Sequence, residues 1–87
     1  MRPEWQLRRE LVAIGRRIYD HGWVAATDGN LSVRASRNRY LVTPAGSCLG
    51  ELRPQDLVYL SGEPYILAGE KPPTSELDMH LAVYAER

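Results

Sequence analysis

The residue types with the clearest chemical potential are adjacent near the end of the chain: the hydroxyls of Thr74 and Ser75, followed by the carboxylate of Glu76. Two prolines precede them, so the hydroxyls are predicted to open a helix over residues 74–87. A helix N-terminus presents unpaired N–H groups and partial positive charge, which favour a bound anion. Glu76 would stand beside that anion, placed to take or give a proton.

The same residues also fit a purely structural arrangement. Ser75 followed three residues later by Asp78 matches a capping box, in which the serine hydroxyl satisfies a free helix N–H. From these residues alone, capping and anion binding both remain open.

Two further loops carry small and polar residues where strands are predicted to end, at residues 27–30 and 43–46. Gly29 and Gly46 let the backbone approach a ligand closely, and consecutive N–H groups in such turns form an anion-binding concavity. Asn30 adds an amide that can donate. Three such segments together are more specific than any one of them.

Composition narrows the class of protein. The chain has 87 residues with eleven basic and eleven acidic side chains, which gives no support for a nucleic-acid partner. It contains no apolar run near the length of a membrane span. The single cysteine, Cys48, suits a cytoplasmic protein. With only His21 and His80 beside it, this chain cannot build a complete His- or Cys-based metal site.

The elements that must position these loops follow from the apolar pattern. An amphipathic helix is predicted over residues 3–19, closed by Gly22. Its arginines are expected on a solvated face. Strands are predicted at residues 31–34, 39–43, 57–60 and 65–67, with a hairpin turn at 35–38. The last helix presents Leu77, Leu81 and Tyr84 on one face. This order predicts an α/β fold (αβα), an antiparallel sheet flanked by helices. Because the chain ends inside that helix, we expect residues 1–87 to be cut short of a natural domain.

Four segments, in order, resemble motifs of the class II aldolase/adducin family, nearest the fuculose phosphate aldolase type. They are GNLSVR at residues 29–34, VTPAG at 42–46, LRPQDLV at 52–58 and KPPTSE at 71–76, the last followed by HLAVYAER at 80–87. The resemblance implies the N-terminal part (residues 1–87) of a class II aldolase-type domain, an incomplete domain that lacks the region with the His zinc ligands.

The resemblance also implies roles for individual residues. The pairs Gly29–Asn30, Ala45–Gly46 and Thr74–Ser75 would hold a substrate phosphate, and Glu76 would be the acid/base carboxylate and could also lie against zinc. In the family, the zinc ligands are a His-x-His pair just after this helix and a third histidine much later. None of them is in this chain, and His80 matches a helix histidine that is not a ligand.

The leading hypothesis is therefore the N-terminal segment of a zinc-dependent, cytoplasmic, homo-oligomeric enzyme that acts on a small sugar phosphate. Its chemistry would be aldol cleavage or related lyase or epimerase chemistry, with zinc in the full-length parent and none bound by this chain alone. The alternatives are an adducin-like structural module without catalysis and a small binding module that associates with itself through exposed strand edges.

We predict that residues 1–87 alone bind zinc weakly, because Zn²⁺ requires about three protein ligands and Glu76 supplies one. Isothermal titration with zinc should show no stoichiometric site tighter than roughly micromolar. A tight one-to-one site would contradict this and would make His80 and Asp78 candidate ligands beside Glu76.

Overall fold

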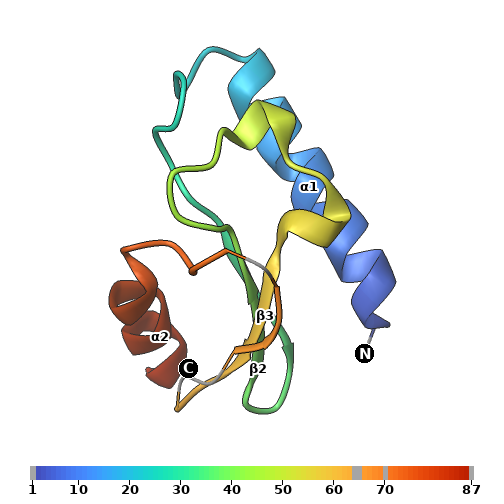
Figure 1. Cartoon of the computed structure of the whole chain (residues 1–87), viewed down its shortest axis with the longest axis vertical. Coiled ribbons are helices and arrows are strands. Elements are labelled where there is room, and N and C mark those ends of the chain that lie inside the picture. Colours follow the sequence, from blue (N-terminus) through green and yellow to red (C-terminus); the bar gives the residue numbers. More distant parts are fainter. Residues whose placement is uncertain (1, 64–65, 70, 87) are drawn as a thin grey trace.

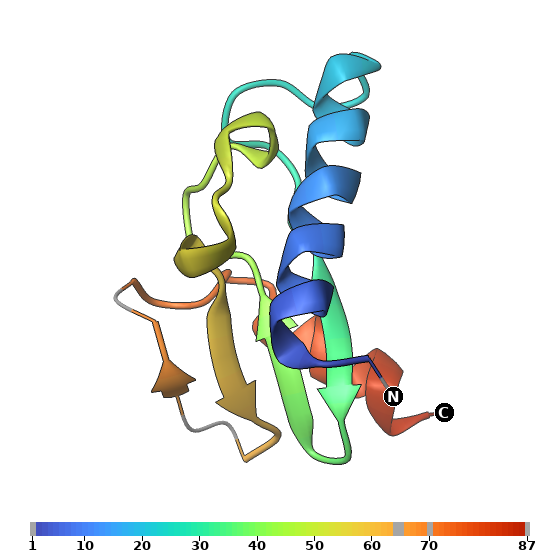
Figure 2. The same cartoon turned by 90° about the vertical axis from the view of Figure 1, so that its right-hand side faces the viewer.

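The computed structural model describes residues 2–63, 66–69 and 71–86, which form three layers. Helix α1 (Glu4–Asp20) covers one face of a four-stranded sheet, and helix α2 (Leu77–Ala85) covers the other (Figure 1). Figure 2, a quarter turn away, shows α1 in front of the sheet and α2 behind it. The predicted αβα arrangement with an antiparallel sheet is confirmed.

The sheet follows the chain order β1-β2-β3-β4, and each neighbouring pair is antiparallel. Its strands are β1 (Ser32–Ser36), β2 (Arg39–Val42), β3 (Val58–Ser61) and β4 (Ile66–Ala68). Two short 3₁₀ helices, η1 (Leu49–Glu51) and η2 (Pro54–Asp56), lie between β2 and β3. The three later strands and α1 lie within one residue of their predicted bounds, and Tyr65 falls outside the described residues.

The core consists of two apolar clusters, one on each face of the sheet. Alternation along β2 divides its side chains, so that Leu41 packs toward α1 while Tyr40 and Val42 pack toward α2. The cluster on the α1 side contains Leu7, Leu11, Ala35, Leu41 and Leu57. The cluster on the α2 side contains Tyr40, Val42, Val58, Leu60 and Leu77, with Leu81 and Tyr84 packed against it. The apolar face predicted for the second helix is therefore confirmed.

The first hairpin turns later than predicted. A β-bulge between Arg34 and Ser36 accommodates an extra residue, Ala35, which is buried in the cluster on the α1 side. The turn predicted over residues 35–38 is therefore wrong in its first half. The chain reverses at Asn38, which has a left-handed φ of 59°.

The second helix begins later than predicted. It starts at Leu77 and not at Thr74, with Glu76 as its N-cap, and Arg87 at its predicted end lies outside the described residues. The capping box of Ser75 and Asp78 is wrong, because the N-cap residue is Glu76 and not Ser75, and the cap has no side-chain hydrogen bond. The reason is local: Thr74 is buried and is held in place before the helix by its own hydrogen bonds.

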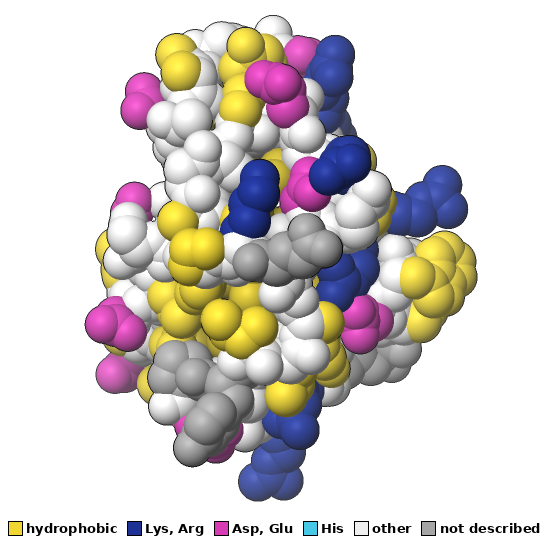
Figure 3. Space-filling view, in the orientation of Figure 1, with side chains coloured by type: hydrophobic (Ala, Val, Ile, Leu, Met, Phe, Trp, Pro, Cys, Tyr) yellow, Lys and Arg dark blue, Asp and Glu magenta, His cyan; other side chains and the backbone are white. Residues whose placement is uncertain are grey.

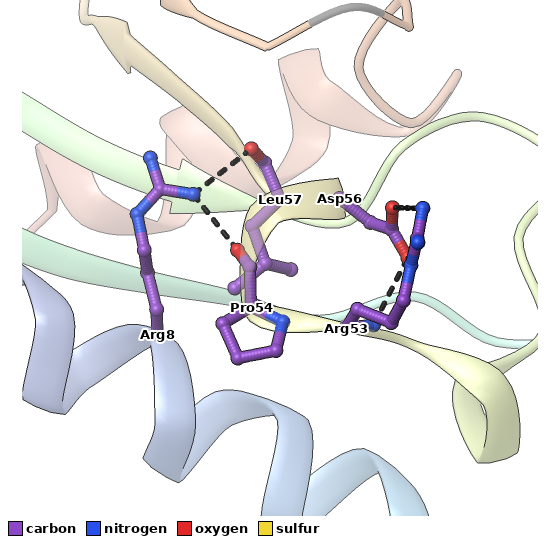
Figure 4. Close-up of polar contacts among 5 residues, drawn as sticks. All are labelled: Arg8, Arg53, Pro54, Asp56 and Leu57. Carbon is purple, nitrogen blue, oxygen red and sulfur yellow. Dashed lines mark hydrogen bonds and ion pairs between the residues drawn. The ribbon is translucent and has the colours of Figure 1, made fainter.

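The predicted solvated face for the arginines of α1 is wrong for Arg8. Its side chain is 14% exposed, and it donates to the carbonyls of Pro54 (2.8 Å) and Leu57 (3.3 Å) (Figure 4). Carbonyl oxygens at the end of a 3₁₀ turn are acceptors without intrahelical partners, and a guanidinium can bind two of them at once. Arg8 thereby fastens the η2 turn to α1, and Glu4 pairs with it at 2.7 Å.

The η2 turn is closed by its own ion pair. The Asp56 carboxylate accepts hydrogen bonds from the Arg53 side chain (2.9 and 3.2 Å) and from its N–H (3.0 Å) (Figure 4). These hydrogen bonds, above all those from the Arg53 side chain, hold the pKa of Asp56 below its usual value. Because the folded state lowers this pKa, the stabilisation is present at neutral pH and is lost as the pH falls through the lowered value.

The surface carries both signs of charge. Acidic and basic side chains occur close together on the face shown in Figure 3, in keeping with a net charge of zero. Within the residues that the structure describes, no helix is long and apolar enough to cross a membrane.

Candidate active site

Hydrogen bonds draw the three polar segments of the sequence together at one end of the sheet. We name them the Asn30 loop (residues 27–30), the Gly46 loop (residues 43–46) and the Glu76 segment (residues 72–76). The Gly46 loop lies between the other two: it bonds to Leu31 on one side and to the Glu76 segment on the other. The close approach of segments so distant in sequence is what the prediction of a joint site required.

Thr43 is the centre of this junction. It is fully buried, at 0% exposure, and all three of its polar groups are used. Its N–H donates to Leu31 O (3.0 Å), its Oγ1 accepts from Leu31 N–H (3.1 Å), and its carbonyl accepts from Thr74 N–H (2.8 Å). A buried polar residue is stable only when its groups are paired in this way, so Thr43 fixes both neighbouring segments at once.

The Gly46 loop and the Glu76 segment are joined by two further contacts. Pro44 forms an isolated β-bridge with Pro73, and the Ala45 N–H donates to Pro72 O at 2.9 Å. Gly46 has a φ of +69°, which favours glycine, and a Cβ placed there would meet nothing within 4 Å. The loop is therefore anchored at its start and open beside its glycine.

Thr74 prepares the entry to α2. Its side chain is buried, and its Oγ1 accepts the N–H of Glu76 at 3.3 Å, while its carbonyl accepts the N–H of Leu77 at 3.1 Å. The Thr74 hydroxyl proton is thereby left for another acceptor. Ser75 and Glu76, in contrast, are exposed.

The Glu76 carboxylate is tied to the Asn30 loop. Asn30 Nδ2 donates to Glu76 Oε2 at 2.7 Å, across 46 positions of sequence. Gly29, just before it, has a φ of +87° and lies against Val24 and Leu49, where a Cβ would come within 3.1 and 3.2 Å of their side chains. Glycine is therefore required there by conformation and by space.

Behind this pair lies a line of polar side chains that connects α2 with β1. Asn30 Oδ1 contacts His80 Nε2, His80 Nδ1 contacts Ser32 Oγ (2.6 Å), and Ser32 Oγ contacts Tyr84 Oη (2.9 Å). All four side chains are half-buried. His80 therefore has a polar partner on each ring nitrogen, which agrees with the structural role expected for it.

The donor set of the described residues does not fit a zinc site. No group of three or more His, Cys, Asp or Glu side chains that could hold a metal lies within residues 2–63, 66–69 and 71–86. Glu76 offers a carboxylate, but both nitrogens of the nearest histidine, His80, already have partners. The described residues therefore do not form a metal centre by themselves.

Sequence reasoning found the loops but missed what joins them. All seven predicted site residues lie on the three segments that meet: Gly29, Asn30, Ala45, Gly46, Thr74, Ser75 and Glu76. Thr43 and Ser32 were missed, because their roles depend on contacts across the sheet that no local pattern reveals. One signal was available: a threonine at the end of an apolar strand and directly before a proline is a candidate for a buried hydrogen-bonding role.

The comparison with family models agrees with this geometry. Residues 9–87 match the model described as "Class II Aldolase and Adducin N-terminal domain". The chain therefore belongs to the class II aldolase and adducin family, as its motifs indicated.

Individual relatives show which kinds of enzyme this chain is similar to. The chain is 46% identical over 74 residues to a 3-oxo-tetronate 4-phosphate decarboxylase of Haemophilus influenzae, covering 85% of this chain and 35% of the relative. It is 35% identical over 80 residues to an L-fuculose phosphate aldolase of Methanocaldococcus jannaschii, covering 92% of this chain and 42% of the relative. The chain thus spans about two fifths of the length of these curated relatives.

A solved structure supports the fold over nearly the whole chain. YgbL of Klebsiella pneumoniae, described as a candidate aldolase/epimerase/decarboxylase, superposes with a TM-score of 0.89 at 38% identity, covering 98% of this chain and 41% of that one. Relatives of this chain are therefore sugar-phosphate enzymes of the class II aldolase family.

We predict that Thr43→Val destabilises the protein by about 1–3 kcal/mol, because it leaves the Leu31 N–H without its acceptor at nearly constant side-chain volume. Urea unfolding should show this as a lower midpoint. Thr27→Val is the matched control: Thr27 is exposed, so its loss should stay within about 0.5 kcal/mol. Equal midpoints for the two variants would show that Thr43 does not hold the junction.

Proposed function

We propose that this chain supplies the phosphate pocket and the proton-transfer carboxylate of a class II aldolase-like enzyme. Its substrate would be a small sugar phosphate, and the reaction would be aldol cleavage or a related lyase or epimerase step. The observation that supports the proposal is the hydrogen bond from the Asn30 side-chain amide to the Glu76 carboxylate.

The phosphate would be held by the three segments that meet at Thr43. Gly29 and Asn30 offer backbone and amide donors, and the Asn30 amide keeps a second N–H beside the one given to Glu76. The hydroxyls of Thr74 and Ser75 face the same junction in this proposal. Short, charge-assisted hydrogen bonds from several such donors are how proteins hold phosphates.

Ala45 and Gly46, the second pair of residues predicted to hold the phosphate, have different roles in this proposal. The N–H of Ala45 is given to Pro72 O, so Ala45 shapes the loop. Gly46 borders open space, and its backbone can approach the ligand. A substitution at Gly46 would strain the left-handed backbone as well as fill that space.

Glu76 would act as the acid/base group. It is exposed and accepts a hydrogen bond from Asn30, so its carboxylate would be oriented before a substrate arrives. Such a group can take the proton from the carbon beside a carbonyl and later return it. Zinc belongs to the same proposal for the full-length protein. Among the described residues, Glu76 is the group proposed to contact it.

A structural role of the adducin type is not favoured. The relatives reported above are enzymes, and a scaffold would have no use for an oriented carboxylate beside two hydroxyls.

Assembly into a homo-oligomer in the cytoplasm completes the proposal. Exposed apolar side chains, among them Trp5 and Trp23 at 61% and 71%, give such an assembly surface to cover.

We predict that Glu76→Gln in the full-length enzyme lowers kcat by roughly 10²–10⁴ while the melting temperature is unchanged, because Gln keeps the oxygen that accepts from Asn30 but cannot transfer a proton. Steady-state kinetics with a sugar phosphate and a melting curve test this. Asp78→Asn, which removes another acidic residue from the first turn of α2, is the control and should leave kcat unchanged.

The result would contradict the proposal if turnover of the Glu76→Gln variant stayed within a few-fold of the parent. In that case, Glu76 would only complement the positive end of the helix, an interaction of about 0.3–1 kcal/mol that acts on stability.

We predict that Ser75→Ala raises KM more than it lowers kcat, because a phosphate contact made equally in the ground and transition states affects binding only. Inhibition by inorganic phosphate should weaken in parallel. A fall in kcat with KM and phosphate inhibition unchanged would remove Ser75 from the pocket.

A further inference from the structure

The half-buried side chains behind Glu76 form a hydrogen-bond chain whose direction can be worked out. An ionised carboxylate only accepts, so the side of Asn30 that faces Glu76 must be its NH₂ group. The Asn30 oxygen therefore faces His80 and accepts, which requires that His80 carries a proton on Nε2.

The hydrogen bond at the other ring nitrogen of His80 continues in the same donor-to-acceptor direction. In a neutral imidazole protonated at Nε2, Nδ1 is an acceptor, and it lies 2.6 Å from Ser32 Oγ, which donates to it. The Ser32 oxygen can in turn accept from the Tyr84 hydroxyl, 2.9 Å away. The direction is consistent throughout: Tyr84 to Ser32 to His80 to Asn30 to Glu76.

We infer that His80, backed by Ser32 and Tyr84, is a positioning residue that fixes the Asn30 amide and, through it, the Glu76 carboxylate. The inference rests on the proposed function for its catalytic consequence. A free asparagine amide can rotate by half a turn and present its oxygen to Glu76, which would repel the carboxylate. The His80 Nε2–H makes that orientation unfavourable, because it would then face the Asn30 NH₂ group.

The residues of this hydrogen-bond chain behind Asn30 lie on two rigid elements. Ser32 begins β1, and both His80 and Tyr84 lie on α2, one helical turn apart, so they share one face. Tyr84 is also held by its ring, whose centroid lies 5.1 Å from that of Tyr40 on β2. A group held on a strand and a helix is positioned more precisely than one on a loop, and Asn30 is on a loop. His80 thus extends the rigidity of the sheet and α2 to the loop.

The first test reads the tautomer directly. Nitrogen-15 NMR of the histidine side chains in the full-length protein, without substrate, should show His80 protonated at Nε2 and bare at Nδ1. The Asn30 side-chain NH₂ signals should be protected from solvent exchange, and His80→Leu should abolish that protection. An Nδ1-protonated or interconverting ring, or Asn30 signals that the substitution does not change, would overturn the inference.

The second test reads the consequence for turnover. His80→Leu should lower kcat by about 10- to 100-fold with a much smaller change in KM, because a misplaced group costs rate while binding persists. His80→Gln, which keeps an N–H donor, should recover most of the loss. His21→Leu is the matched control, since the His21 ring contacts the Arg17 carbonyl and the Trp23 ring instead, and the variant should leave kcat unchanged.

Two milder variants keep the inference falsifiable if His80→Leu folds poorly. Ser32→Ala removes the donor that keeps Nδ1 unprotonated, whereas Tyr84→Phe keeps the ring packed on Tyr40 and removes only the last hydroxyl. The loss of kcat should fall in the order His80, Ser32, Tyr84. A kcat for both His80 variants within twofold of the parent, or a loss equal for all three positions, would refute the positioning role.

The NMR test separates this inference from the proposed function. An Nε2 tautomer with protected Asn30 signals, together with a fully active Glu76→Gln variant, would refute the acid/base role of Glu76 alone. The reverse pattern, an inactive Glu76→Gln variant with a freely interconverting His80 ring, would refute the inference alone.

Discussion

The pairing of one buried threonine is the constraint on which the rest of this structure depends. Thr43 has no contact with solvent, so each of its polar groups must find a partner within the protein. Its N–H and hydroxyl oxygen continue the pairing of β1 with β2 by one step, and its carbonyl reaches the segment before α2. The requirement to satisfy one residue thus places two segments that the sequence separates by more than forty positions.

That pairing also explains where α2 begins. The Thr74 N–H is given to Thr43 and the preceding proline is bridged to Pro44, so both hold the chain against the Gly46 loop as far as Thr74. The chain turns at Ser75 and Glu76, α2 begins at Leu77, and the Glu76 carboxylate faces Asn30. The late start of the helix and the position of the candidate acid/base group have the same cause.

The sequence predicted most of the fold but less of the site. Helix α1 and the strands follow from apolar periodicity, which is local and which the two-sided core preserves. The bulge at Ala35 and the burial of Arg8 could not be predicted, since both depend on what another element presents: a core pocket in one case, the carbonyls of η2 in the other. The same limit applies to the site. The three loops are visible as residue types, whereas the links of Ser32, His80 and Tyr84 exist only once α2 lies across β1.

The link between Asn30 and Glu76 joins residues 46 positions apart, and that between Ser32 and Tyr84 joins residues 52 apart. Contacts of such sequence separation form late, after the chain between them has paid its loop-closure entropy. During synthesis, the contact that holds the Asn30 loop in place can therefore form only after α2 has been made. Local unfolding that detaches α2 would break the Asn30–Glu76 contact, whereas the pairing of β1 with β2 makes no use of α2. A ligand that binds both segments would stabilise the contact between them. Its binding would be measurable as slower hydrogen exchange in α2.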